Sequence, residues 1–67
     1  MKAFIARDSD CKLFLYSPNP PIKETTQWIS LDGRSSIFRI DDGLFPEVKW
    51  EDEEPTEINI EIVSKHQ

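Results

Sequence analysis

Residues 2–17, KAFIARDSDCKLFLYS, decide the fold of this chain. Two runs rich in aromatic and aliphatic residues, 2–7 and 12–17, flank the polar segment 8–11. Short apolar runs on either side of a few turn-forming residues are typical of a β-hairpin, and aspartate is favoured at the first position of a type I turn. We therefore predict two antiparallel strands joined by a tight turn.

The charges beside the turn indicate the length of its loop. A three-residue loop, Ser9 to Cys11, sets Asp8 opposite Lys12, and opposite charges across a strand pair are mildly favourable. A two-residue loop instead sets Arg7 against Lys12, which places like charges together. The three-residue loop is therefore predicted, and it puts Cys11 at a left-handed backbone position where glycine is usual.

Both faces of this hairpin are apolar. In the three-residue register, one face carries Phe4, Ala6, Phe14 and Tyr16, and the other carries Ala3, Ile5, Leu13 and Leu15. A half-exposed hairpin would alternate apolar and polar residues. Either the sheet curls so that the chain covers both faces itself, or a second molecule covers the sheet of these two strands. We expect the curled sheet, because a small domain first covers its own apolar surface.

The middle of the chain predicts a connector followed by a second hairpin. Residues 18–26, PNPPIKETT, have three prolines in four positions, which excludes a central strand there. Residues 27–31, QWISL, and 36–40, SIFRI, predict the two strands of the second hairpin, with its turn at 32–35.

The last third predicts a turn, a loop and a final strand. Residues 44–48, LFPEV, predict a short turn of 3₁₀ type whose apolar side chains close one end of the sheet. Residues 49–55 predict an exposed loop with Trp50 as its buried anchor. Residues 57–63 alternate, with the isoleucines at 58, 60 and 62 facing inward, and predict an edge strand. Residues 64–67 are expected to be frayed.

Together these elements predict an all-β fold. It is a small, mostly antiparallel sheet of about five short strands, curled or half-barrel, with one short 3₁₀ turn near 44–48. Residues 1–67 are expected to form a single small β domain, because a chain of this length buries only about 60% of its unfolded surface.

The net charge of −5 is unevenly distributed. Residues 1–46 hold six acidic and six basic residues, whereas residues 47–67 hold seven acidic residues against Lys49 and Lys65. Such a field would repel nucleic acid and anionic membrane and attract a basic surface. We therefore expect neither nucleic acid nor a membrane as a partner.

Cysteine content and hydrophobic run length bear on the compartment. Cys11 is the only cysteine, so an internal disulfide is impossible. The apolar stretch at residues 3–6 is shorter than the roughly 7–15 residues of a signal-peptide core. No run approaches the roughly 20 apolar residues of a membrane span. These observations predict a cytoplasmic protein.

Residues 50–55, WEDEEP, place four consecutive carboxylates before the final strand. In one interpretation the charge only keeps the loop solvated and discourages edge-to-edge pairing with another chain. In the other it docks on a basic partner surface, and Trp50 is either an anchor in the core or an interface hot spot. The candidate partner-binding residues are Trp50, Glu51, Asp52, Glu53, Glu54 and Glu57.

No arrangement of residues predicts an enzyme. A nucleophile needs an adjacent base, but Cys11 lies in the hairpin turn and His66, the only histidine, stands next to the last residue. The acidic runs lack the glycine and the ligand count of a calcium loop. Gly33 and Gly43 lie in turn contexts and not in a phosphate-binding loop. We predict no catalytic residue, no cofactor and no metal site.

Four aromatic residues, Phe14, Tyr16, Trp28 and Phe38, invite comparison with the stacking platforms of proteins that bind single-stranded nucleic acid. Such a surface needs positive charge, which this chain does not offer. We expect the four aromatic side chains to lie in the core.

The order KAFIARD, a turn, LFLY and then DDGLFPEVKWEDEEPTEINIEI resembles a group of very short, uncharacterised bacterial and phage-associated proteins. They share the ending W-E-D-E-x-P-x-E before an alternating strand, with LFP upstream. The resemblance covers most of the chain, and residues 44–58 are its distinctive part. It implies a bacterial or phage setting and no particular activity. Such proteins tend to have glycine where this chain has Cys11, in agreement with the left-handed position predicted from the turn.

These observations favour a non-enzymatic protein-interaction module. It would present the acidic segment 47–57 to an unknown protein with a basic surface, and in a phage or mobile-element setting that partner could be a nucleic-acid-binding protein. The alternative is a structural β protein, a weak homodimer that self-associates through the sheet of its first two strands, whose acidic segment serves only solubility.

Overall fold

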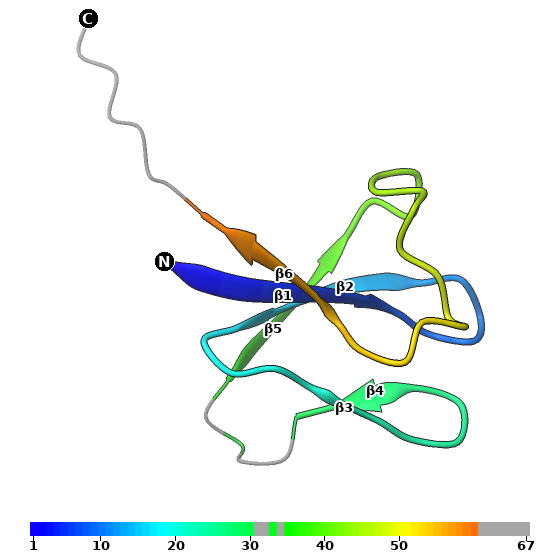
Figure 1. Ribbon diagram of the computed structural model, residues 1–67, viewed down its shortest axis with the longest axis horizontal. Coiled ribbons are helices and arrows are strands. Elements are labelled where there is room, and N and C mark those ends of the chain that lie inside the picture. The colour runs from blue at the N-terminus through cyan, green and yellow to red at the C-terminus, as the bar shows by residue number, and fades with distance from the viewer. Residues whose placement is uncertain (31–32, 34, 61–67) are drawn as a thin grey trace, which may run out of the picture.

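Figure 1 shows the computed structural model, which describes residues 1–30, 33 and 35–60. Six strands follow one another along the described chain: β1 (Lys2–Arg7), β2 (Leu13–Ser17), β3 (Ile22–Lys23), β4 (Trp28–Ile29), β5 (Ser36–Ile40) and β6 (Thr56–Asn59). Four of them form an antiparallel sheet in the order β5-β2-β1-β6, and β3 and β4 form a second antiparallel sheet. The all-β prediction is confirmed, with six strands in place of about five. No helix able to cross a membrane occurs in this part of the chain.

The first hairpin has the predicted register. Phe4 pairs with Tyr16, and Asp8 N donates to Lys12 O (2.9 Å) at the turn end of the ladder. Cys11 N donates back to Asp8 O (3.0 Å), which closes the turn over the predicted three-residue loop. Strands and turn are contiguous here, so local preferences and the apolar pattern are sufficient to specify the pairing.

Cys11 occupies the left-handed position expected of it, with a φ of 73°. The neighbouring Asp10 supports the loop, since its Oδ1 accepts a hydrogen bond from Lys12 N (3.1 Å). A residue with a Cβ atom is strained in this backbone region, because the Cβ approaches the following carbonyl oxygen. The thiol itself is exposed, so burial of the side chain does not offset that strain.

The predicted second hairpin between residues 27–31 and 36–40 is wrong. β4 pairs with β3, and β5 pairs with β2 over five residue pairs, from Leu13–Ile40 to Ser17–Ser36. β5 forms five residue pairs with β2, whereas β4 is a two-residue strand and could pair with β5 over two residues only. Leu31, Asp32 and Arg34, which belong to the predicted strand and turn, lie outside the described residues.

The predicted connector, residues 18–26, contains a strand that the sequence did not indicate. β3 begins directly after the last proline, and Glu24 N donates to Gln27 O (2.7 Å), so a two-residue turn joins β3 to β4. A loop this short costs less entropy to close than a connection to a distant strand. The prolines themselves stay outside every strand, as expected.

Both apolar faces of the first hairpin are covered by the chain itself. On one face, Ile5 and Leu13 form a buried cluster with Val48. On the other, Ala6 and Tyr16 form a buried cluster with Trp28, which β4 contributes. The sheet is not closed into a barrel, and the β3–β4 hairpin is what covers the second face. The β1–β2 surface predicted for self-association is therefore buried within one chain.

The turn near 44–48 is hydrogen-bonded but is not 3₁₀. Val48 N donates to Phe45 O (2.9 Å), which closes a single turn with Pro46 at its second position. Phe45, the first residue of this turn, has a left-handed φ of 50°, which is uncommon for a residue other than glycine. Only Val48 closes the core as expected, because Leu44 is 50% and Phe45 36% exposed.

β6 is an edge strand, as predicted. Ile58 packs against the cluster of Ile5, and Glu57 is exposed. Ile60 N donates to Met1 O (2.8 Å), which extends the pairing with the start of the chain. The expectations for Ile62 and for fraying at 64–67 fall outside the described residues.

The backbone of Cys11 generates a first testable prediction. Cys11→Gly should raise the free energy of unfolding by about 1 kcal/mol, because glycine adopts a left-handed φ without a Cβ clash. Cys11→Ala is the matched control, since it removes the thiol and keeps the Cβ, and it should give no such gain. Reversible urea unfolding measures both. Equal stabilities for the two variants would mean that the backbone at residue 11 is unstrained.

Candidate functional site

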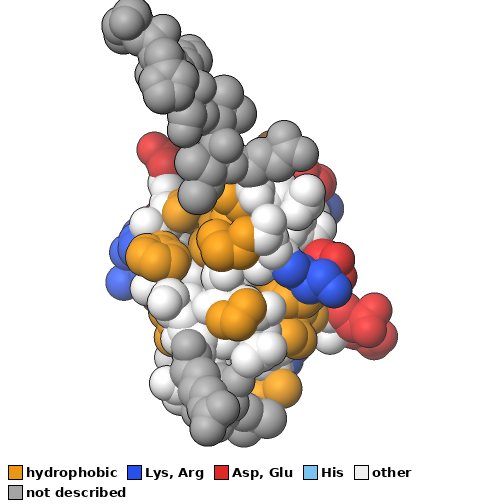
Figure 2. Space-filling model, turned by 90° about the vertical axis from the view of Figure 1, so that its left-hand side faces the viewer, with side chains coloured by type: hydrophobic (Ala, Val, Ile, Leu, Met, Phe, Trp, Pro, Cys, Tyr) orange, Lys and Arg blue, Asp and Glu red, His pale blue; other side chains and the backbone are white. Residues whose placement is uncertain are grey.

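The acidic segment lies between the turn that ends at Val48 and the start of β6. Glu51, Glu53 and Glu54 are exposed, and Asp52 is half-buried. In the view of Figure 2, red acidic side chains project from the margin of a face on which orange hydrophobic side chains are scattered. The segment therefore offers the carboxylates of Glu51, Glu53 and Glu54 to solvent.

Lys23 of β3 holds the backbone of this segment. Its Nζ donates to Trp50 O (2.5 Å) and to Asp52 O (3.0 Å). The same ammonium lies 4.2 Å from the centroid of the Trp50 ring and 5.8 Å from that of Trp28. A cation over an aromatic face is attracted by the ring's charge distribution. One side chain thus anchors both the backbone and the aromatic ring of the segment.

Asp52 contributes to the shape of the segment through its carboxylate. Asp52 Oδ2 accepts a hydrogen bond from Lys49 N (3.0 Å), while Asp52 N donates to Lys49 O (3.1 Å). These reciprocal bonds close a turn at residues 49–52. Asp52 is the one acidic side chain of the run whose carboxylate bonds to the protein's own backbone.

Trp50 is half-buried and packs against the cluster formed by Ala6, Tyr16 and Trp28. With Lys23 on its ring, the indole has contacts on both the β1–β2 face and β3. Trp50 therefore packs against the core and keeps part of its side chain at the surface.

The remaining carboxylates have few partners of their own. Glu51, Glu53 and Glu54 make no hydrogen bond and no ion pair with the residues that the structure describes. Glu57 forms an ion pair with Lys2 at 3.8 Å, in which the side chains are 59% and 62% exposed. Exposed pairs of this kind contribute little to stability. The four glutamates are therefore available to an external cation.

Arg7, at the end of β1, fixes the chain that leads into the segment. All three guanidinium nitrogens donate, and the acceptors are Val48 O (2.7 Å), Cys11 O (2.8 Å), Asp42 O (3.0 Å), Leu44 O (3.1 Å) and Phe45 O (3.2 Å). The planar guanidinium has five N–H groups, so it can serve five carbonyl acceptors at once. Arg7 thereby ties the first hairpin to the loop that places Val48 in the core.

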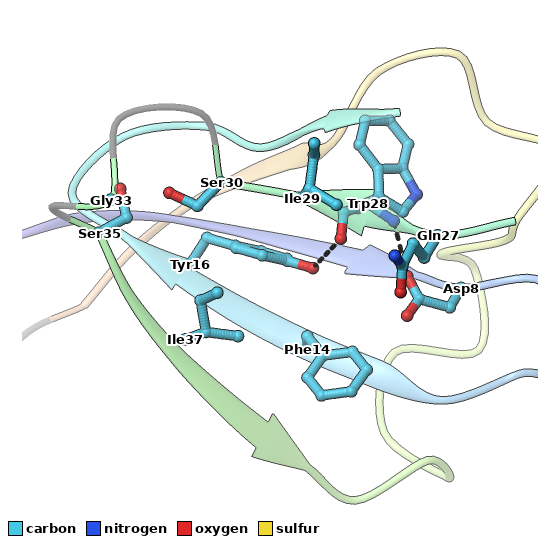
Figure 3. A pocket seen from close by; sticks show the side chains of 10 residues that line it. All are labelled: Asp8, Phe14, Tyr16, Gln27, Trp28, Ile29, Ser30, Gly33, Ser35 and Ile37. Atoms are coloured by element: carbon cyan, nitrogen blue, oxygen red, sulfur yellow. Dashed lines mark hydrogen bonds between the residues drawn. The ribbon is translucent and has the colours of Figure 1, made fainter. Parts of the chain in front are cut away.

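A cavity of about 520 Å³ opens between β4 and the sheet of β2 and β5 (Figure 3). Tyr16 and Ile37 reach it from the sheet, and Trp28 and Ile29 from β4. The Tyr16 hydroxyl donates to Trp28 O (3.2 Å), which leaves it an internal contact of the fold. The described lining contains one carboxylate, that of Asp8, the two serines Ser30 and Ser35, and no cysteine, histidine or lysine.

Two side chains at this cavity have perturbed pKa values. Burial raises the pKa of Asp8, and this effect outweighs the hydrogen bond that its Oδ1 accepts from Trp28 N (2.9 Å). Burial also raises the pKa of Tyr16 to about 12, with Asp8 adding to it. Tyr16 is therefore a neutral hydrogen-bond donor at physiological pH. The buried indole N–H of Trp28 has no acceptor among the described residues.

The aromatic residues expected in the core divide into two groups. Tyr16 and Trp28 are buried, and Phe14 packs against them, so these predictions are confirmed. Phe38 is 55% exposed, and its predicted core position is wrong. It lies on the edge strand β5, where the sheet has no neighbour to cover it.

Arg7 and Lys23 were not predicted from the sequence as residues that hold the loops in place. The strand alternation could have indicated Arg7, because it places this charge on the apolar face of Ile5 and Leu13, where a charge needs partners. Lys23 gave no such signal, since it follows three prolines in a presumed connector. Among the described residues, no three histidine, cysteine or acidic side chains come together as a metal site requires.

Comparison of the chain with protein-family models, with curated proteins and with solved structures finds no match. The geometry of the described residues therefore carries the functional interpretation alone.

The guanidinium of Arg7 generates a second prediction. Arg7→Lys should lower the free energy of unfolding by about 2–3 kcal/mol, because one ammonium cannot serve five carbonyl groups spread over two loops. Arg39→Lys is the control: Arg39 is an exposed arginine of the same sheet, with an ion pair to Asp42. It should change stability by less than about 1 kcal/mol. Similar losses in chemical denaturation would contradict the role given to Arg7.

Asp8 generates a prediction about pH. Burial raises the pKa of Asp8 in the folded state above its ordinary value, so its negative charge opposes folding above that folded pKa and ceases to do so as pH falls. Asp8→Asn keeps the acceptor for Trp28 N and removes the charge. The variant should be at least as stable as the wild type at pH 7, with the difference shrinking as pH falls through the folded pKa.

Asp41→Asn is the control for this experiment, because Asp41 is exposed and its Oδ1 accepts from Gly43 N (2.7 Å), a bond that asparagine can keep. Unfolding should be followed from pH 7 to pH 3. A loss of stability at pH 7 in Asp8→Asn alone would show that the charge of Asp8 is needed for its hydrogen bond to β4.

Proposed function

We propose that this protein is a non-enzymatic protein-interaction module. Its docking surface consists of Glu51, Glu53, Glu54 and Glu57, and its partner is a protein with a basic surface. One observation carries the proposal: three of these carboxylates have no ion pair among the described residues, on a segment whose backbone is held by Lys23. A merely solubilising loop would not need that support.

The order that Lys23 gives to the backbone of the acidic segment would increase its affinity for a partner. A segment that is already ordered loses less conformational entropy on binding than a flexible acidic tail would. Lys23 and Asp52 supply that order from the module's own side, and Trp50 supplies it through packing. In this proposal Trp50 and Asp52 support the surface, and the four glutamates meet the partner.

Electrostatics would determine how the partner arrives. Acidic groups gathered at one place raise the association rate of a basic protein, and at physiological ionic strength salt largely screens this attraction beyond about 8–10 Å. In a phage or mobile-element setting, this partner would be a basic nucleic-acid-binding protein. The module would then offer it negative charge in place of nucleic acid.

The triple variant Glu51→Gln, Glu53→Gln, Glu54→Gln tests the proposal. It should stay folded and lose the basic proteins that the wild type captures from a bacterial lysate, with identification by mass spectrometry at low and moderate salt. With a purified partner, the loss should lie mainly in the association rate, and the salt dependence of the remaining affinity should flatten.

A matched control removes the same charge elsewhere. Asp10, Glu24 and Asp41 are exposed acidic residues outside residues 47–57, and Asp10→Asn, Glu24→Gln, Asp41→Asn reduces the negative net charge equally. This control should retain the partners. If the two triple variants behave alike, net charge rather than the segment governs capture, and the docking proposal is wrong.

A further inference from the structure

Among the residues that the structure describes, the outer edge of β5 has unpaired backbone groups, and their positions follow from the register. In an antiparallel ladder, hydrogen-bonded and non-hydrogen-bonded pairs alternate. Asp8 N donates to Lys12 O, so the even-numbered residues of β2 bond to β1 and the odd-numbered ones turn toward β5. Through the β2–β5 register, Ile37 and Arg39 then turn their N–H and C=O groups away from the sheet.

The side chains on this edge are also exposed. Ile37 is 51% and Phe38 55% exposed, and alternation places them on opposite faces of the sheet. Edge strands are usually protected from pairing by lysine, proline or a bulge, none of which occurs within β5. The one charged residue of β5, Arg39, forms an ion pair with Asp42 (Nη2 to Oδ2, 3.0 Å). Its Cζ lies 5.7 Å from the centroid of the Phe14 ring.

The other edge of the sheet differs. β6 carries the exposed carboxylate of Glu57, beside Lys2 of β1. The two edges, green β5 and orange β6 in Figure 1, therefore present unlike surfaces. Of the two edge strands of the four-stranded sheet, β5 is the more apolar one within the described part of the chain.

A second copy of β5 fits this edge in one register. Only Ile37 and Arg39 can exchange hydrogen bonds across it, and pairing Ile37 of one copy with Arg39 of the other aligns all five strand residues. Phe38 then faces Phe38, and aromatic pairs opposite each other are favourable. Pairing Arg39 with Arg39 would set like charges together, and pairing Ile37 with Ile37 would align only three strand residues.

We propose that β5 pairs antiparallel with β5 of a second copy of this chain, giving a two-fold symmetric dimer with one continuous eight-stranded sheet. Two five-residue strands fall short of the roughly 1,200–2,000 Å² buried in stable interfaces, so the dimer is weak, with a dissociation constant in the micromolar to millimolar range. The acidic segment precedes β6 at the opposite edge, so dimerisation leaves it exposed.

Sedimentation equilibrium from micromolar to millimolar concentration, in about 150 mM salt to screen the acidic chains, tests the proposal. The wild type should shift from monomer toward dimer as concentration rises. Phe38→Lys should weaken the dimer at least tenfold, and Ile37→Lys provides a second variant should the first not fold. Leu44→Lys is the matched control, because Leu44 is 50% exposed and lies outside β5.

A wild type that stays monomeric at millimolar concentration overturns the proposal. So does equal weakening by Phe38→Lys and Leu44→Lys, which would indicate general charge repulsion. If a dimer forms that neither Phe38→Lys nor Ile37→Lys weakens, it uses another surface, and the proposal is equally overturned.

Disulfide formation tests the register. Non-hydrogen-bonded antiparallel partners lie about 4.5 Å apart at their Cα atoms, within disulfide range. In a Cys11→Gly background, Phe38→Cys should therefore cross-link under mild oxidation at millimolar concentration. Ile37→Cys should not, because its opposite residue is Arg39. Efficient cross-linking of Ile37→Cys, or none of Phe38→Cys, would overturn the register.

Discussion

The five-fold donation by Arg7 is the interaction on which the rest of this structure depends. The domain has no helix and only short strands among its described residues, so its loops need a fixed centre. The guanidinium supplies one, because its planar set of five N–H groups can satisfy carbonyls from several segments together. Val48 reaches the core through this arrangement, and the acidic segment begins two residues later. The burial of Val48 and the position of the proposed docking surface thus both depend on Arg7.

The parts of the fold that were predictable from sequence are those that contiguous residues decide. Facing charges and an aspartate at the turn predicted the register of β1 and β2 and the left-handed Cys11. The partner of β5 was not predictable in this way. SIFRI pairs as readily with one apolar strand as with another, and the choice of β2 follows from the longer ladder that it offers. The local periodicity of a sequence does not indicate which distant strands pair.

The candidate site was likewise predictable only where neighbouring residues decide its structure. The exposure of Glu51, Glu53 and Glu54 could be predicted, because four adjacent carboxylates cannot be buried together. The supporting contacts could not, since Lys23 meets the backbone of Trp50 from 27 positions away and Arg7 meets Val48 from 41. The misplacement of Phe38 has a related cause: an aromatic residue in an apolar run is exposed when the run forms the edge of the sheet.

The position of β1 between β2 and β6 has a consequence for biosynthesis. Phe4 pairs with Tyr16 on one side and with Glu57 on the other, so one side of β1 finds its neighbour early and the other late. At about 5–20 residues added per second, the ribosome completes β6 about 2–8 s after β2. During that interval the nascent hairpin exposes an unpaired edge and the apolar side chains of Ala3 and Ile5. This is the stage at which chaperone binding would protect the newly made chain from aggregation.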